Sequence, residues 1–366
     1  RSSPHVAIIL ADDLGWANVG WHRDGTDPEV VTPALEELVA SGIELTQFYA
    51  FKYCSPTRGA LLSGRNPIHV NVVNGPITCH NRADPISGYS GVPVAMTTLP
   101  AKMRQAGYIP HAVGKWHCGM AIEEQTPAGR GYETWLGYFS ACNDYWNNKP
   151  ACGDSTCGST SMIDLWEQNR SAAGDRPGRY LSRPALGLNN SGQCSQGRQQ
   201  GCDFEDDLFE RRVTSIITAH ANSNEPRPLF LYWATHAVHG PRQVPQATLD
   251  NFTFIDWVPR RTYHALVTYL DGMVGRVVGT FKEAHMWDDT VVFFSSDNGG
   301  DDQANNYPLR GAKFSNWQGG VRVAAFVAGG YLPEARRGIK LAGLATVWDL
   351  YATAQVVGGV TEASAV

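Results

Sequence analysis

Short, uninterrupted runs of apolar residues recur along the chain and alternate with segments of helical periodicity. The runs have the composition of strands buried on both faces of a parallel sheet, and they cover residues 5–11, 108–113, 228–234 and 290–296. Less regular strands are expected at residues 43–50 and 321–327. Apolar residues at helical spacing predict helices at residues 34–40, 99–106, 206–221, 263–281 and 346–357. This alternation predicts an α/β fold in which helices cover both faces of a large, mostly parallel sheet.

Polar residues directly follow the apolar runs. They are Asp12 and Asp13 after 5–11, Lys115 and His117 after 108–113, His239 after 228–234, and Asp297 and Asn298 after 290–296. Because the carboxyl ends of parallel strands meet at one edge of a sheet, we expect these side chains to lie close together. Taken alone, each is more typical of a solvated turn or of an ordinary surface residue than of a functional site.

The acidic and amide residues of this set offer only oxygen ligands. A site built from Asp12, Asp13, Asp297 and Asn298 favours a hard cation, Ca²⁺ or Mg²⁺, over zinc, for which histidine and cysteine ligands would be expected. Because the ligands are crowded and leave few places for water, we predict Ca²⁺ and regard Mg²⁺ as the less favoured ion.

Residues 54–65 form the most unusual segment of the chain. They read Cys-Ser-Pro-Thr-Arg-Gly-Ala-Leu-Leu-Ser-Gly-Arg, which is the pattern C-x-P-x-R-x-x-x-L-x-G-R. Pro56 suits the first turn of a helix, so Cys54 is expected just before a helix N-terminus, where backbone N–H groups and the helix dipole favour an anion. A cysteine considered alone is more often a buried structural residue or half of a disulfide.

The whole pattern at residues 54–65 resembles the signature of the sulfatase family, in which this cysteine is oxidised to formylglycine. Further segments resemble family blocks in family order, at residues 11–16, 114–117, 238–241, 296–300 and 309–313. The similarity spans residues 4 to 330 and is greatest to the arylsulfatase B (N-acetylgalactosamine-4-sulfatase) type. Thr57 stands where many members have serine, and Cys118 where an apolar residue is usual.

The resemblance implies an alkaline-phosphatase-like fold and the hydrolysis of aryl or carbohydrate sulfate monoesters. It implies a metal site, holding Ca²⁺, made of Asp12, Asp13, Asp297, Asn298 and an oxygen of residue 54. It also implies catalytic roles for Cys54, Arg58, Lys115, His117, His239 and Lys313. Sulfate ester cleavage needs a nucleophile, positive charge around the sulfate oxygens and a proton for the departing alcohol, and these residue types can provide all three. His236 is interpreted as a supporting residue.

The implied reaction begins when a hydroxyl of the hydrated formylglycine at position 54 attacks sulfur, with Arg58 favouring the ionised form of that hydroxyl. His239 or Lys313 protonates the leaving oxygen and a covalent sulfate remains on residue 54. His117 then removes the proton of the second hydroxyl, which expels sulfate and restores the aldehyde. The family also has a smaller C-terminal domain, which we expect to be truncated or absent because the chain ends at Val366.

The region from residue 119 to 227 has poor periodicity and is rich in Gly, Ser, Asn, Cys and Arg. We interpret it as a loop-rich, disulfide-stapled insertion that shapes the substrate entrance of a single catalytic domain covering residues 1–366. Cys118 is expected to be a free thiol. The remaining cysteines are Cys79, Cys142, Cys152, Cys157, Cys194 and Cys202, and these six allow fifteen pairings. Together with sequons at Asn169, Asn189 and Asn251, they predict a secretory-pathway protein, lysosomal or extracellular.

The composition of the chain limits the classes of molecule that it is expected to bind. With 366 residues, 43% of them hydrophobic, the chain can bury one large core, and its net charge of −5 supplies no basic field for nucleic acid. The longest apolar runs are far shorter than a membrane span. We therefore expect a sulfated small molecule or sulfated glycan as substrate and, from the resemblance, the formylglycine-generating enzyme during maturation.

Two other functions fit the same residues. A related hydrolase of phosphate monoesters or phosphonates could use the same residue-54 aldehyde, and a comparison of rates on nitrophenyl sulfate and nitrophenyl phosphate separates the two. A non-catalytic glycan-binding protein is the second alternative. Every position implied to be catalytic is filled, which argues against it, whereas an unmodified Cys54 in native protein would favour it.

Overall fold

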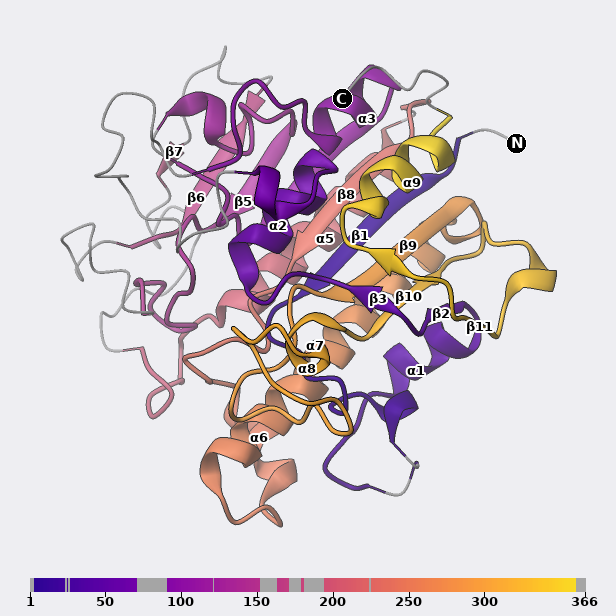
Figure 1. Ribbon diagram of the computed structural model, residues 1–366. Helices are drawn as coiled ribbons and strands as arrows, with labels where there is room; N and C mark the ends of the chain where they lie inside the picture. Colours follow the sequence, from indigo (N-terminus) through magenta and orange to yellow (C-terminus); the bar gives the residue numbers. More distant parts are fainter. Residues whose placement is uncertain are drawn as a thin grey trace.

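A ten-stranded sheet forms the centre of the molecule, with strand order β11-β2-β10-β9-β1-β8-β4-β5-β6-β7 (Figure 1). The computed structural model describes residues 3–23, 25, 27–70, 91–120, 122–151, 163–170, 179–180, 194–223 and 225–359. Five adjacent central strands run parallel, namely β9 (Thr290–Ser296), β1 (His5–Ala11), β8 (Leu229–Ala234), β4 (Ile109–Gly114) and β5 (Thr134–Gly137). These central strands include all four of the apolar runs predicted to be buried strands.

The flanks of the sheet are mixed. On one side β10 (Ala325–Ala328) pairs antiparallel with β9 and with β2 (Ile43–Leu45), and β11 (Ile339–Leu341) runs parallel to β2. On the other side β6 (Trp166–Asn169) pairs antiparallel with β5, and β7 (Arg179–Tyr180) pairs antiparallel with β6. A separate two-stranded sheet joins β3 (Phe48–Tyr49) to β12 (Ala345–Thr346).

Helices cover both faces of the sheet, and alternate residues of β1 show the division. Ala7, Ile9 and Ala11 point into a core closed by α1 (Pro33–Ala40), α5 (Glu205–Asn222) and α7 (Val258–Glu283). Val6, Ile8 and Leu10 point into the opposite core, closed by α2 (Cys54–Ser63), α3 (Leu99–Gln105) and α9 (Asp349–Val357). Figure 1 shows α2, α3 and α9 in front of the sheet and α7 behind it. The predicted α/β sandwich is therefore confirmed.

Some predicted boundaries were wrong. The single strand expected at 43–50 is two strands, because the chain leaves the main sheet after β2 and pairs with β12 through β3. The strand expected at 321–327 starts only at Ala325, since Val321 still belongs to the short helix α8 (Gln318–Val321). The helix expected at 346–357 starts at Asp349, whose carboxylate accepts a hydrogen bond from the Thr346 backbone N–H.

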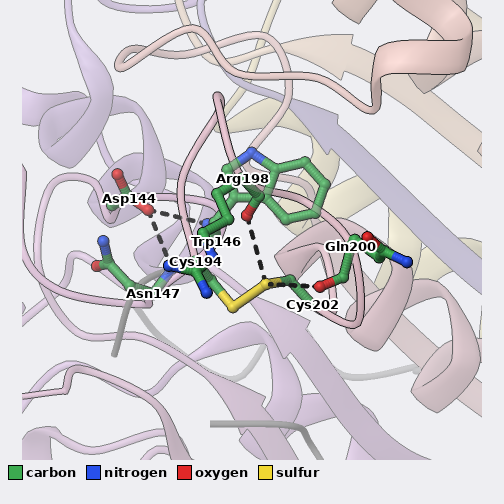
Figure 2. Close-up of a disulfide and its surroundings, with 7 residues drawn as sticks. All are labelled: Asp144, Trp146, Asn147, Cys194, Arg198, Gln200 and Cys202. Carbon is green, nitrogen blue, oxygen red and sulfur yellow. Dashed lines mark hydrogen bonds between the residues drawn. A yellow bond between two sulfur atoms is a disulfide. The ribbon is translucent and has the colours of Figure 1, made fainter. Parts of the chain in front are cut away.

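The region 119–227 contains β5, β6 and β7, which its composition did not predict, and α5, which it did. Cys194 and Cys202 form a disulfide beside the turn at Asp144, which Figure 2 shows together with Trp146. Cys142 is also disulfide-bonded, whereas Cys54 and Cys118 are free thiols. The other predicted disulfide cysteines, Cys79, Cys152 and Cys157, lie outside the described residues. The substrate entrance and the 1–366 domain boundaries stay predictions.

Among the helices that the structure describes, none combines the length and the apolar character needed to cross a bilayer.

Candidate active site

The polar groups that follow β1, β8, β4 and β9 meet at one edge of the sheet, because these four strands are neighbours and parallel. Helix α2 brings Cys54 to the same place, and every residue from Cys54 to Ser63 is buried. Two of the strand-end residues have left-handed backbone conformations, Asp13 with φ 59° and His117 with φ 51°. Such conformations cost on the order of 1 kcal/mol each and concentrate at functional sites.

Asp12 accepts hydrogen bonds from several directions. Its Oδ2 lies 2.6 Å from Lys115 Nζ and 3.3 Å from Arg58 Nη2, and all three side chains are fully buried. The Cys54 thiol lies 3.5 Å from Asp12 Oδ1. Burial alone would raise the pKa of Asp12, but the charges of Lys115 and Arg58 outweigh it and hold that pKa well below its usual range.

Asp13, Lys313 and His239 form a second contact group. Lys313 Nζ lies 2.7 Å from Asp13 Oδ1 and donates to His239 Nε2 at 3.1 Å. His239 Nδ1 lies 2.7 Å from the Gly240 carbonyl oxygen, so the ring donates there and keeps Nε2 as an acceptor. Burial lowers the pKa of His239 to about 3 despite the nearby Asp13, so the imidazole is neutral near pH 7.

Arg58 joins Asp297 to the backbone after β4. Its Nη2 and Nε lie 2.7 and 3.1 Å from Asp297 Oδ2, and its Nη1 donates to the Lys115 carbonyl oxygen at 3.3 Å. Burial and the charge of Asp12 raise the pKa of Asp297 to about 6 even though Arg58 opposes that shift. Burial is thus the largest influence on Asp297, and a further cation at this place would favour its ionised form.

Four potential ligand atoms, from Asp12, Asp13, Cys54 and His239, lie within 4.8 Å of one another. Asn298 Nδ2 donates to Asp13 Oδ1 at 2.6 Å, and its buried Oδ1 has no hydrogen-bond partner among the described residues. A buried amide oxygen is satisfied when it coordinates a hard cation. The residues present therefore fit a divalent cation. His239, predicted only as a proton carrier, also lies within ligand distance of this group.

Cys54 and His117 differ from the ion-paired residues. Burial, followed by the charges of Asp12 and Asp297, raises the pKa of the Cys54 thiol to about 12, so the unmodified cysteine is not a thiolate nucleophile at neutral pH. His117 is buried, and neither ring nitrogen has a hydrogen-bond partner in the described structure. Burial and the charge of Lys115 hold the pKa of His117 well below its ordinary value, which leaves it a neutral base.

Several supporting residues escaped the sequence reasoning. Tyr145 donates its hydroxyl hydrogen bond to the His239 carbonyl oxygen at 3.0 Å, and its ring stacks on His236 at 3.7 Å. Glu205 Oε1 lies 3.0 Å from His236 Nδ1, and Asp206 accepts from the backbone N–H of His236. The acidic start of α5 was visible in the sequence, but nothing local shows that it bonds to the segment that follows β8. His236 is thus a supporting residue, as interpreted.

The structure brings together all ten of the predicted site residues, and it does so at one end of the sheet. A family model described as Sulfatase matches residues 4–357. The chain belongs to the sulfatase family.

Individual sulfatases resemble the chain along most of its length. Arylsulfatase J of Mus musculus is 31% identical over 328 residues, which cover 89% of this chain and 48% of that protein. The N-acetylgalactosamine-6-sulfatase of Homo sapiens is 26% identical over 369 residues, which cover 99% of this chain and 63% of that protein. The chain thus spans 48 to 63% of the length of these curated relatives.

Solved sulfatase structures share the fold. A crystal structure of Ps i-CgsB in complex with k-i-k-neocarrahexaose has a TM-score of 0.78 and 26% identity, covering 99% of this chain and 73% of that chain. The PsFucS1 sulfatase from Pseudoalteromonas sp. has a TM-score of 0.76 and 22% identity, covering 98% and 68%. The arylsulfatase B type suggested by the sequence stays a prediction within this family.

Proposed function

We propose that the protein hydrolyses sulfate monoesters at the site formed by Cys54, Arg58, Lys115, His239 and Lys313. The observation that carries this proposal is the convergence of buried cations on the N-terminus of α2, where the signature cysteine lies next to Asp12. A tetrahedral oxyanion is stabilised where fixed cations and helix N–H groups converge.

The metal proposed for this site is Ca²⁺. Asp12, Asp13, Asp297 and Asn298, with an oxygen of residue 54, would hold it. Asn298 Oδ1, which has no hydrogen-bond partner among the described residues, supports a hard cation at this place. When bound, the ion supplies positive charge for the sulfate oxygens and lowers the pKa of an oxygen nucleophile. The nucleophile is proposed to be the formylglycine hydrate made from Cys54, because the thiol itself stays protonated at neutral pH.

The chain's own residues then divide the remaining work. Arg58 and Lys115 fix the carboxylate of Asp12, which lies next to residue 54, since their charged ends lie 3.3 and 2.6 Å from Asp12 Oδ2. Lys313, in contact with His239 Nε2, supplies a proton to the departing alcohol oxygen at that position. His117, neutral and without a hydrogen-bond partner in the described structure, is free to accept the proton in the step that releases sulfate.

A carbohydrate sulfate is the proposed substrate class. N-acetylgalactosamine-6-sulfatases are among the relatives, and a structural neighbour was crystallised with a neocarrahexaose. The disulfide Cys194–Cys202 and the exposed sequon residues Asn169 and Asn251 support a secretory-pathway location, lysosomal or extracellular, which we propose together with maturation by the formylglycine-generating enzyme.

Rates on 4-nitrophenyl sulfate and 4-nitrophenyl phosphate, with Cys54→Ala as the control, test the function. We expect sulfate hydrolysis that the Cys54→Ala variant lacks, and a mass for the peptide around residue 54 that shows conversion of the thiol. Faster phosphate than sulfate hydrolysis would instead assign the phosphohydrolase alternative. An unmodified Cys54 in native protein, with neither ester hydrolysed, would assign the non-catalytic one.

A further inference from the structure

An exposed aromatic ring stands beside the catalytic cations. Phe314 follows Lys313 directly, and the Lys313 ammonium lies 5.4 Å from the centre of the Phe314 ring. The side chain of Lys313 is almost fully buried, whereas Phe314 is 68% exposed. On its other side Phe314 meets the ring of Tyr53, the residue before Cys54, with centroids 5.9 Å apart and planes inclined by 31°. We call Tyr53 and Phe314 the aromatic platform.

Neither burial nor backbone preference explains the phenylalanine. Phe314 has a φ of 71°, a left-handed conformation that glycine adopts without strain and that a bulky residue rarely takes. Its backbone is fixed there by a hydrogen bond from the Phe314 N–H to the Lys52 carbonyl oxygen at 2.6 Å. A strained backbone that leaves most of an apolar ring in water costs stability, and such strain concentrates at ligand sites.

The position of the platform fits the part of the substrate that carries the sulfate. Tyr53 and Phe314 are the chain neighbours of Cys54 and Lys313, which are proposed to supply the nucleophile and the leaving-group proton. The Phe314 ring is therefore within reach of a group bonded to the sulfate through the oxygen that Lys313 protonates. The inference deepens the proposed function and rests on it.

An open, one-sided ring surface favours a sugar over an aryl group. A sugar ring has an apolar C–H face that packs on an aromatic ring while its hydroxyl edges stay hydrated. An aryl ring gains most from a closed slot that removes water from both of its faces, and the exposure of Phe314 is not that of a slot wall.

We propose that the aromatic platform of Tyr53 and Phe314 binds the sugar ring that carries the scissile sulfate, so the substrate is a pyranose sulfate and Phe314 is a specificity-determining residue.

The test measures binding separately from turnover. The Cys54→Ala protein is titrated calorimetrically with inorganic sulfate, with 4-nitrophenyl sulfate and with monosulfated methyl glycosides of galactose and N-acetylgalactosamine. The glycoside that binds most tightly is then used. The same titrations follow with Phe314→Gly and Phe314→Trp added, and with Phe254→Ala as a control that removes another exposed phenyl ring, 54% accessible. Thermal unfolding of each variant is recorded.

We expect Phe314→Gly to weaken glycoside binding at least fivefold, to change sulfate binding less than twofold, and to leave Tm unchanged or higher because glycine relieves the backbone strain. Phe314→Trp should restore the glycoside affinity, and Phe254→Ala should not alter it. A loss below twofold, or equal losses for glycoside and sulfate, would overturn the platform. So would a larger loss for 4-nitrophenyl sulfate than for the glycoside, or no binding of any glycoside when sulfate binds. Because these titrations need no catalysis, a failure of sulfate hydrolysis alone would count against the proposed function and not against the platform.

Discussion

Replacing Arg58 by methionine should destabilise the fold much more than the removal of a surface arginine. The Arg58 side chain has no solvent exposure, and its Nη2 lies 2.7 Å from Asp297 and 3.3 Å from Asp12, whose side chains are equally buried. Methionine keeps much of the volume but leaves these carboxylates without their shared cation. Removing one partner of a buried ion pair costs about 3–5 kcal/mol, a large share of the 5–15 kcal/mol that typically stabilises a domain.

The assay is equilibrium unfolding in urea, which gives the free energy of unfolding for each variant in the same buffer. Arg276→Met is the matched control, because Arg276 pairs with Glu210 at the surface with its side chain 56% exposed, and we expect a loss below about 1 kcal/mol. The double variant Arg58→Met/Asp297→Asn should recover at least about 1 kcal/mol relative to the sum of the single losses. A loss below about 1 kcal/mol for Arg58→Met, or strict additivity, would refute the view that this pair is one buried unit.

Three further outcomes are expected. Cys54→Ser should retain one covalently bound sulfate, because a serine ester has no second hydroxyl to expel it. The bound sulfate would be seen as added mass on the peptide that contains residue 54. Repeated turnover by this variant would contradict the proposed reaction. Gly114→Ala should lose at least about 3 kcal/mol of unfolding free energy, because the new Cβ would clash with the Ala234 carbonyl oxygen. The control Gly107→Ala has a similar φ of 89° and no described atom within 4 Å of the new Cβ, so it should lose only about 1 kcal/mol. Equal losses for the two variants would show that the clash is not the cause. Burial raises the pKa of Asp271 to about 6, so ionisation of this carboxylate lowers the free energy of unfolding. The loss is absent below about pH 4, where Asp271 is protonated in both the folded and the unfolded state, and it reaches its full size above about pH 6. Wild type should therefore lose on the order of 2 kcal/mol relative to Asp271→Asn as the pH rises through that window, and parallel stability curves would show that burial does not act as described.

Local sequence signals were sufficient for the centre of the fold. The apolar runs ending at Ala11, Ala234 and Ser296 are strands whose composition is set by burial on both faces, so the pattern identifies them without knowledge of their partners. The residues that follow these runs were predicted to lie at one edge of the sheet because the carboxyl ends of parallel strands meet there. The signature around Cys54 added the chemistry, because no periodicity distinguishes this cysteine from a structural one.

The sequence could not predict features that depend on distances between distant segments. Strands β6 and β7 lie in a polar, glycine-rich region, where β6 pairs with the edge of β5 and β7 pairs with β6. The contact between Lys313 and His239 joins loops 74 residues apart, and no local pattern encodes it. The exposed ring of Phe314 looked like any apolar residue after a lysine, and only its backbone angle and its exposure made it unusual.

The complete burial of helix α2 has a consequence for the conversion proposed for Cys54. Cys54 is 4% exposed, and the helix that begins with it contacts α3 and α9, the last helix of the described chain. An enzyme that has to bind the residues of α2 would find all of them buried once the helix is packed in the fold. We therefore expect the conversion proposed for Cys54 to precede the folding of this helix.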